Sequence, residues 1–288
     1  MKLLLATSIF TVASTKGASS FRPKGFSSAI RQVNNKSFLT SSSTSLSTMS
    51  KTEGWISIHS DKTKAELVKT SGIDWVATSQ AGGVYRKMIE REGTEKVARA
   101  TTIVKFDPNQ EFPRHTHDGG EEFLVLDGVW RDDYGAFPKY SYVRNYIGSG
   151  HTPSIGEEGC TILVKLRQMS HNSNDEPEHK AWESWTPENS PGIAKQDLYA
   201  SSLERTSVQL WPANSSIDIT IPKNGAEIFV VDGKFSSHLG DHDEWSWCRV
   251  PNDTEGEIKF SVKTGSEPAY VWTKEAHLAS DEVGMAKP

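Results

Sequence analysis

The sequence contains little cysteine: Cys160 and Cys248 are the only two in 288 residues, and no CxxC pair occurs. Two cysteines cannot build a disulfide framework, and without a closely spaced pair neither a zinc ribbon nor a redox-active dithiol is predicted. We interpret both as small buried apolar residues. Beyond the N-terminus no apolar run is long enough to span a bilayer, so we expect no membrane partner for the mature form.

Acidic residues are missing from the first part of the chain. Residues 1–52 hold seven lysines and arginines and no aspartate or glutamate. The remainder therefore carries 25 basic and 37 acidic residues, a net charge of −12. Because so acidic a body leaves no basic surface to neutralise phosphates, nucleic acid is excluded as an expected partner.

The N-terminus has the composition of a targeting sequence. A short apolar run at 3–13 and small residues at 18–20 predict a signal peptide, and 21–52 is rich in serine and threonine, as transit peptides are. The combination resembles the bipartite plastid presequences of algae with complex plastids. We therefore predict that 1–50 is a disordered presequence and that the protein is located in a plastid. The alternatives are a secreted protein with a linker after its signal, or a cytosolic product that begins at Met49.

The rest of the chain has the pattern of short strands. Runs of β-branched and aromatic residues occur at 101–106, 122–126 and 161–166, separated by Asp-Pro, Asp-Gly and glycine-rich turns. Amphipathic helix is predicted only near 61–70 and 198–204. This pattern is typical of an all-β sandwich or small barrel.

One β unit occurs twice, 105 residues apart. Residues 120–128 align without a gap on 225–233, and Phe106, Asn109 and Trp130 then align on Trp211, Asn214 and Phe235. An internal repeat of this kind predicts two copies of one supersecondary unit.

The repeat suggests the domain organisation. We predict a first, metal-binding domain at 51–170 and a second, degenerate domain at 192–288. Between them, 171–191 is rich in asparagine, acidic residues and proline and is predicted to be a linker. Its tryptophans, Trp182 and Trp185, are expected to pack it onto a barrel.

Three residues in the first copy are predicted to bind a metal ion. Side chains two apart on a strand point to the same face, so His115 and His117 face one way, and Glu121 lies in phase with them. A barrel interior would reject such a polar patch unless a cation satisfied it. Two histidines and one carboxylate with open positions are typical of non-haem Fe(II) oxygenases.

A fourth ligand is expected from the glycine-rich hairpin at 147–153, where His151 would begin the returning strand. Glu122 points to the opposite face from Glu121. We therefore expect Glu122 at the rim or satisfied in the core, and not as a ligand.

These motifs resemble those of a known family. His115-x-His117-x3-Glu121-x6-Gly128 is similar to the first cupin motif and Gly148-x2-His151 to the core of the second, although Tyr140 and Tyr146 replace the usual glycine and proline of the latter. Residues 75–168 are similar to cupins of the ChrR type. The resemblance implies all-β, double-stranded β-helix (jelly-roll) barrels in tandem. It also implies one divalent metal ion held by His115, His117, Glu121 and His151.

Two functions follow from the resemblance. Related cupins are dioxygenases that cleave small β-diketones or hydroxyaryl ketones with Fe²⁺ and O₂, so a small ketone or diketone substrate is one expectation. Arg99, Arg114, Tyr142 and Arg144 are candidates to contact an enolate oxygen. The alternative is a metal sensor or binding module that holds Zn²⁺ without turnover. The ligand set suits Fe²⁺, Zn²⁺ and Mn²⁺ alike.

The second copy lacks the ligands. The repeat places Thr220 over His115, Pro222 over His117 and Ala226 over Glu121, and Gly256 falls at His151. A nearby hairpin shift offers only Glu255, Glu257 or Lys259. We predict that this copy is metal-free and contributes packing area or the surface of a homodimer.

Overall fold

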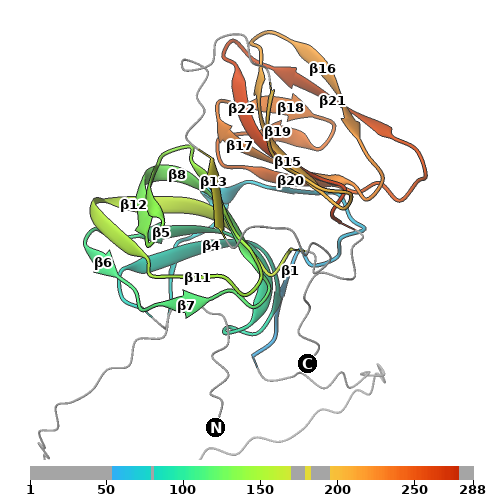
Figure 1. Ribbon diagram of the computed structural model, residues 1–288. Helices are drawn as coiled ribbons and strands as arrows, with labels where there is room; N and C mark the ends of the chain where they lie inside the picture. Colours follow the sequence, from blue (N-terminus) through green and yellow to red (C-terminus); the bar gives the residue numbers. More distant parts are fainter. Residues whose placement is uncertain (1–53, 79–80, 170–178, 183–194, 279–288) are drawn as a thin grey trace, which may run out of the picture. The chain divides into compact units, whose positions relative to one another are not determined.

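The computed structural model describes residues 54–78, 81–169, 179–182 and 195–278 (Figure 1). The predicted presequence at 1–50 lies outside the described residues, as does most of the predicted linker at 171–191.

The described part of the chain is built from strands, with one short 3-10 helix, η1 (Thr70–Gly72). The first half forms a ten-stranded antiparallel sheet and a separate two-stranded ribbon. The sheet runs in the order β1-β4-β5-β12-β8-β10-β13, with β3, β6 and β9 paired at its sides. Its strands are β1 (Ile56–Ile58), β3 (Val76–Ala77), β4 (Val84–Gly93), β5 (Ala98–Phe106), β6 (Gln110–Glu111), β8 (Glu121–Asp132), β9 (Gly135–Pro138), β10 (Tyr142–Asn145), β12 (Ser154–Leu166) and β13 (His179–Trp182). The ribbon pairs β7 (His115–Thr116) with β11 (Gly150–His151).

The second half of the chain, together with β2, also forms two sheets. A six-stranded sheet runs β14-β15-β22-β17-β20-β2, and a four-stranded sheet runs β16-β21-β18-β19. Their strands are β2 (Glu66–Val68), β14 (Lys195–Ala200), β15 (Arg205–Trp211), β16 (Ser216–Ile221), β17 (Ala226–Asp232), β18 (Phe235–Ser237), β19 (Gly240–His242), β20 (Trp247–Val250), β21 (Ile258–Thr264) and β22 (Ala269–Glu275). The protein is therefore all-β, with two jelly-roll barrels in tandem.

The backbone confirms the repeat. Asn109 and Asn214 both lie in the left-handed region, with φ of 60° and 51°. Tyr140 and Trp245, also 105 residues apart, share φ values of 71° and 62°. Tyr140 thus occupies the left-handed turn that its motif usually gives to glycine, which is unusual for so bulky a residue. The same chain path recurs even where the side chains differ.

Gly128 and Gly233 have the same structural role in their barrels. Each has a positive φ, and a Cβ atom at either position would lie 2.2 Å from a carbonyl oxygen, that of Gly159 or of Pro268. The glycine that ends the first cupin motif is therefore required by close backbone approach.

Neither predicted helix forms. Residues 66–68 lie in β2, which pairs with β20 of the second barrel, and 198–200 lie in β14. The loop before β2 is held by Arg249, whose guanidinium donates to the carbonyl oxygens of His59, Asp61 and Lys64 at 2.7–3.0 Å. The amphipathic pattern at 61–70 was overridden by partners more than 180 residues away in sequence.

Strand pairing departs from the predicted domain ranges at two places. β2 lies in the predicted first domain but pairs in the second sheet, while β1 of the same segment pairs with β4 of the first. β13 lies in the predicted linker, yet pairs along its whole length with β10. Trp185 lies outside the described residues, and only the backbone of Trp182 is described.

Three clusters of buried apolar side chains form the core. The first barrel is filled by one cluster that includes Phe106, Phe123, Trp130 and Ile162. The second is filled by another, which includes Trp211, Ile228, Phe235, Phe260 and Val271. The third cluster combines side chains of both halves: Val68, Ile89, Ile103, Leu124, Leu126, Tyr142, Leu163, Leu198, Val208, Phe229, Val231, Trp247, Tyr270 and Trp272. The two barrels therefore share one apolar interface.

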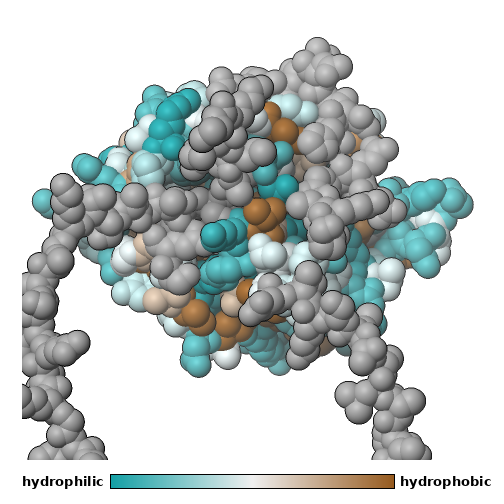
Figure 2. Space-filling model, turned by 90° about the horizontal axis from the view of Figure 1, so that it is seen from below, coloured by the Kyte–Doolittle hydropathy of each residue, from teal (hydrophilic) through white to brown (hydrophobic). Residues whose placement is uncertain are grey.

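The surface has few large apolar side chains. Among the described residues, the large hydrophobic side chains that are exposed are Val76 and Tyr134. Figure 2 shows one face, on which hydrophilic residues alternate with small hydrophobic patches. The described ranges hold no helix with the length and hydropathy that a membrane crossing requires.

Candidate metal centre

The ribbon of β7 and β11 brings two of the predicted ligands face to face. His115 pairs directly with His151, and Thr116 with Gly150. A Cβ atom at position 150 would lie 2.9 Å from the His115 carbonyl oxygen, so glycine lets the two strands approach. A turn is present, because the Ser149 N–H donates to the Tyr146 carbonyl oxygen. The predicted hairpin at 147–153 does not form, since β11 pairs with β7 and not with a strand next to it in sequence, and His151 ends β11 instead of beginning a returning strand.

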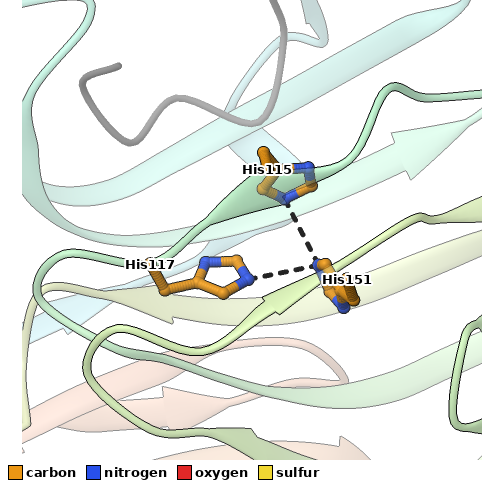
Figure 3. Close-up of side chains that lie close together, drawn as sticks. All are labelled: His115, His117 and His151. Atoms are coloured by element: carbon orange, nitrogen blue, oxygen red, sulfur yellow. Dashed lines mark hydrogen bonds between the residues drawn. The ribbon is translucent and has the colours of Figure 1, made fainter. Parts of the chain in front are cut away.

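The three histidines converge through their Nε2 atoms (Figure 3). His151 Nε2 lies 3.2 Å from His115 Nε2 and 3.2 Å from His117 Nε2. Candidate ligand atoms of all three residues lie within 4.8 Å of one another. Ligands about 2.0–2.2 Å from one metal ion lie roughly 3.0–3.6 Å apart, so the observed spacing fits a shared ion.

Glu121 begins β8 beside the histidines. Its Oε2 atom lies 3.5 Å from His117 Nε2 and 3.7 Å from His151 Nε2. The carboxylate is completely buried, as are His117 and His151, whereas His115 is half-buried. The structure therefore brings all four residues predicted from the sequence to one place.

The hydrogen bonds behind the histidines define their tautomers. His115 Nδ1 lies 3.1 Å from the Pro113 carbonyl oxygen, and His151 Nδ1 lies 3.0 Å from Asp132 Oδ2. These oxygens only accept, so both Nδ1 atoms carry the proton. In neutral rings the two Nε2 atoms then present lone pairs to each other at 3.2 Å. Two lone pairs repel unless a cation lies between them, and histidines that bind metals are held in this way.

Burial favours the neutral, metal-binding form of these rings. It lowers the pKa of His115 to about 4, against the opposing effect of Glu121. It lowers the pKa of His117 to about 3, and the neighbouring His151 acts in the same direction. At neutral pH both rings therefore offer lone pairs and not positive charge.

Two buried polar atoms of the site have no hydrogen-bond partner among the described residues: Glu121 Oε1 and His117 Nδ1. An unsatisfied carboxylate oxygen in an apolar interior is costly. Its presence beside three converging imidazoles fits a divalent metal ion. The donor set of three nitrogens and one carboxylate suits zinc, manganese or iron.

Sequence reasoning missed the residues that support the ligands. Asp132 accepts hydrogen bonds from His151 and from the Trp130 indole. Although burial acts to raise the pKa of Asp132, these bonds and one from the Tyr134 N–H lower it. Asn145 donates to Glu121 Oε2 at 3.1 Å. One signal could have found Asn145: the repeat aligns it with Val250, a polar inward position in one copy and an apolar one in the other.

Three of the four proposed substrate contacts lie elsewhere. Arg99 is buried against Glu90 at 2.5 Å. Tyr142 and Arg144 both donate to Glu122 and point from β10 to the opposite face from Asn145. These expectations were wrong because strand alternation places the side chains in the interface between the barrels.

Two further residues that the sequence singled out, Glu122 and Arg114, lie in different environments. Glu122 is buried in that same interface and away from the ligands, as expected. Arg114 is exposed beside the site and pairs with Asp133 at 2.6 Å.

The comparisons with known proteins agree with this geometry. The model of the ChrR cupin-like domain matches residues 63–170. This segment is similar to the ChrR cupin-like domain. It contains His115, His117, Glu121 and His151. No curated protein matches the sequence.

Solved structures share the fold at low identity. Bacterial pirin YhhW from Escherichia coli, in complex with nickel(II), superposes with a TM-score of 0.57 at 13% identity, over 74% of this chain and 99% of that one. A proposed dioxygenase from Nostoc punctiforme superposes with a TM-score of 0.56 at 12% identity, over 82% of this chain and 92% of that one. The protein Ylba from E. coli superposes with a TM-score of 0.55 at 12% identity, over 76% of this chain and 93% of that one. At such identities the likeness establishes the cupin fold across both barrels.

The second barrel has a different interior at the corresponding place. Thr220, which aligns with His115, is exposed on β16 and pairs with Lys259, also exposed. Ile221 and Ala226 belong to the apolar cluster there. That the second barrel binds no metal remains a prediction, supported by these side chains.

Proposed function

We propose that the protein is a metal-dependent cupin of the dioxygenase type, acting on a small ketone or β-diketone. The observation that carries the proposal is the convergence of three histidine Nε2 atoms on a buried carboxylate, with two rings held as the Nδ1-protonated tautomer. A redox-active ion such as Fe²⁺, held by His115, His117, Glu121 and His151, would supply O₂ activation and bind the carbonyl oxygens of the substrate.

The residues of the chain have separate tasks in this proposal. His117, His151 and Glu121 are buried and exclude water from one side of the centre. The half-buried His115 marks the side from which a small molecule can approach. Near the centre, Tyr134 is 42% exposed, donates to the Gly150 carbonyl oxygen and stacks on His179 with ring centroids 3.9 Å apart. A flat, conjugated enolate is the kind of ligand that an aromatic rim accommodates.

The structurally similar protein from Nostoc punctiforme is described as a dioxygenase, and this description is the support that it gives to an oxygenase function. The decisive test is oxygen consumption. Protein purified without affinity-resin metals and loaded anaerobically with Fe²⁺ should consume O₂ with a panel of β-diketones and hydroxyaryl ketones. The matched control is the His115→Ala/His117→Ala double variant, which should consume none. Equal consumption by both proteins would contradict the proposal.

A zinc-binding sensor or binding module is the second candidate, favoured by the match to the ChrR cupin-like domain. The same donor set suits Zn²⁺, which is redox-inactive. Metal analysis of the purified protein separates the candidates in part. Tight zinc binding together with no O₂ consumption by the iron-loaded protein would establish the sensor over the oxygenase.

A further inference from the structure

A strand at the edge of the first barrel's sheet lies next to the candidate metal centre. β13 pairs with β10, and β10 pairs with β8, so that His179, Asn145 and Glu121 stand directly opposite one another on three adjacent strands. His179 belongs to the segment predicted as a linker. Its neighbours in space are nevertheless residues of the site.

The three side chains form one chain of hydrogen bonds, in which His179 donates to Asn145 and Asn145 donates to Glu121. Asn145 Nδ2 donates to Glu121 Oε2 at 3.1 Å, so the amide presents Oδ1 on its other side. His179 Nδ1 lies 2.8 Å from that Oδ1 atom. An amide oxygen can only accept, so His179 is the donor. The histidine thereby determines which way the Asn145 amide faces.

The His179 ring is itself held in place. It stacks on the Tyr134 ring with an interplanar angle of 1°. The centroid of the Phe137 ring lies 5.7 Å from that of His179, and the two rings are tilted relative to each other. Tyr134 in turn donates to the carbonyl oxygen of Gly150, the residue before His151. The donor nitrogen of His179 is therefore held relative to β11, the strand that carries His151.

We propose that His179 is a positioning residue of the metal centre, which acts through Asn145 to orient the Glu121 carboxylate. The proposal rests on the proposed function only in assuming that the centre binds a divalent ion. Glu121 Oε2 is the oxygen nearest to the histidine nitrogens, and Asn145 is the donor to it. Without His179 the amide can rotate and present its oxygen to the carboxylate, which would repel it.

The second barrel provides an internal comparison. Its equivalents of Asn145 and Glu121 are Val250 and Ala226, paired in the same register on β20 and β17. Both are buried in the apolar cluster of that barrel. The polar chain thus occurs in the barrel that holds the three histidines, and the same two positions are apolar in the other.

Two substitutions separate the hydrogen bond of His179 from its ring. His179→Phe keeps an aromatic ring for Tyr134 and loses the donor. His179→Asn keeps a donor near the place of Nδ1 and loses the ring. Lys180→Ala, an exposed position on the same strand, controls for disturbance of β13. Asn145→Ala interrupts the chain from its other end.

The probe is Co²⁺, bound to the full chain in competition with a chelator and followed by its visible absorption spectrum. Loss of a group that orients a ligand typically weakens metal binding about 10- to 100-fold. We expect that loss, with a changed spectrum, for His179→Phe and Asn145→Ala, and no further loss in their double variant. His179→Asn and Lys180→Ala should stay within about threefold of the wild type.

The outcomes distinguish the inference from the proposed function. If the wild type binds no cobalt, the metal centre and this inference both fail. If the wild type binds cobalt and His179→Phe matches it in affinity and spectrum, the inference alone is overturned. Should His179→Phe not fold, wild-type behaviour of Asn145→Ala overturns the inference equally.

Discussion

Glu122 of the first barrel forms a buried ion pair with Lys274 of the second. The reverse pair is also present, because Glu227 of the second barrel binds Lys165 of the first at 2.5 Å. Glu122 and Glu227 are 105 residues apart, and each lysine lies opposite its own barrel's glutamate on the neighbouring strand. The two barrels therefore meet through equivalent surfaces, as identical subunits do across a twofold axis.

Other residues of the interface follow the same relationship. Tyr142 donates to Glu122, and Trp247, which the repeat aligns with Tyr142, donates to Glu227 at 3.1 Å. The repeat is thus preserved in the contacts between the barrels, although the three converging histidines lie in the first barrel.

The first prediction concerns this ion pair. Lys274→Met should lower the free energy of unfolding by about 3 kcal/mol, because it leaves the buried Glu122 without one of its cations. The double variant Glu122→Gln/Lys274→Met should be less destabilised than the sum of the single changes. Urea unfolding measures all three. Additive effects would show that the two side chains are not coupled.

The second prediction is an acid sensitivity. Burial acts to raise the pKa of Glu122, but Lys274 and Arg144 outweigh it and lower the pKa from 4.5 to about 2. A carboxylate with a depressed folded pKa stabilises the protein above its unfolded pKa and loses that contribution as pH falls through the folded value. The urea midpoint should therefore drop between pH 4.5 and 2. Glu122→Gln should flatten this drop, and Glu255→Gln, at an exposed position, should not.

The third prediction concerns the metal ligands. The wild type should bind about one divalent ion per chain, and His117→Ala should lose at least about a hundredfold in affinity. His238→Ala, which changes an exposed histidine of the second barrel, is the matched control and should bind as the wild type does. Equal metal content in wild type and the His117 variant, measured by elemental analysis, would exclude the assignment.

The fourth prediction is a stoichiometry. Because the second barrel has Thr220, Pro222 and Ala226 at the ligand positions and an apolar interior, it should bind no divalent ion. The His115→Ala/His117→Ala variant should then contain no metal. One ion remaining in that variant would reveal a second centre.

The fifth prediction concerns residues 1–50, which we propose to be a plastid presequence on their composition. Fused to a fluorescent protein in an alga with complex plastids, they should direct it into the plastid. Secretion of the fusion or its retention in the cytosol would favour one of the two alternatives instead.

The two-copy β architecture and the four residues that converge at the centre could be predicted from the sequence. Both depend on local regularities: strand alternation places His115, His117 and Glu121 in phase, and the offset of 105 residues makes the second copy visible. The repeat also aligns Asn109 with Asn214, and the structure shows that both adopt the positive φ that asparagine tolerates.

The contacts between the two barrels, and those that support the four candidate ligands, could not be predicted from the sequence because they depend on long-range strand pairing. β2 pairs with a strand about 180 residues later, so the helical pattern around it had no bearing on the outcome. Arg144 belongs to the interface between the barrels and does not face a substrate site. Its guanidinium lies 2.7 Å from the carboxylate of Glu204, a residue of the other barrel. His179 reaches the site through a strand pairing that no local pattern encodes. Such pairings depend on which surfaces meet after folding, and the residues involved are too far apart in sequence for periodicity to record them.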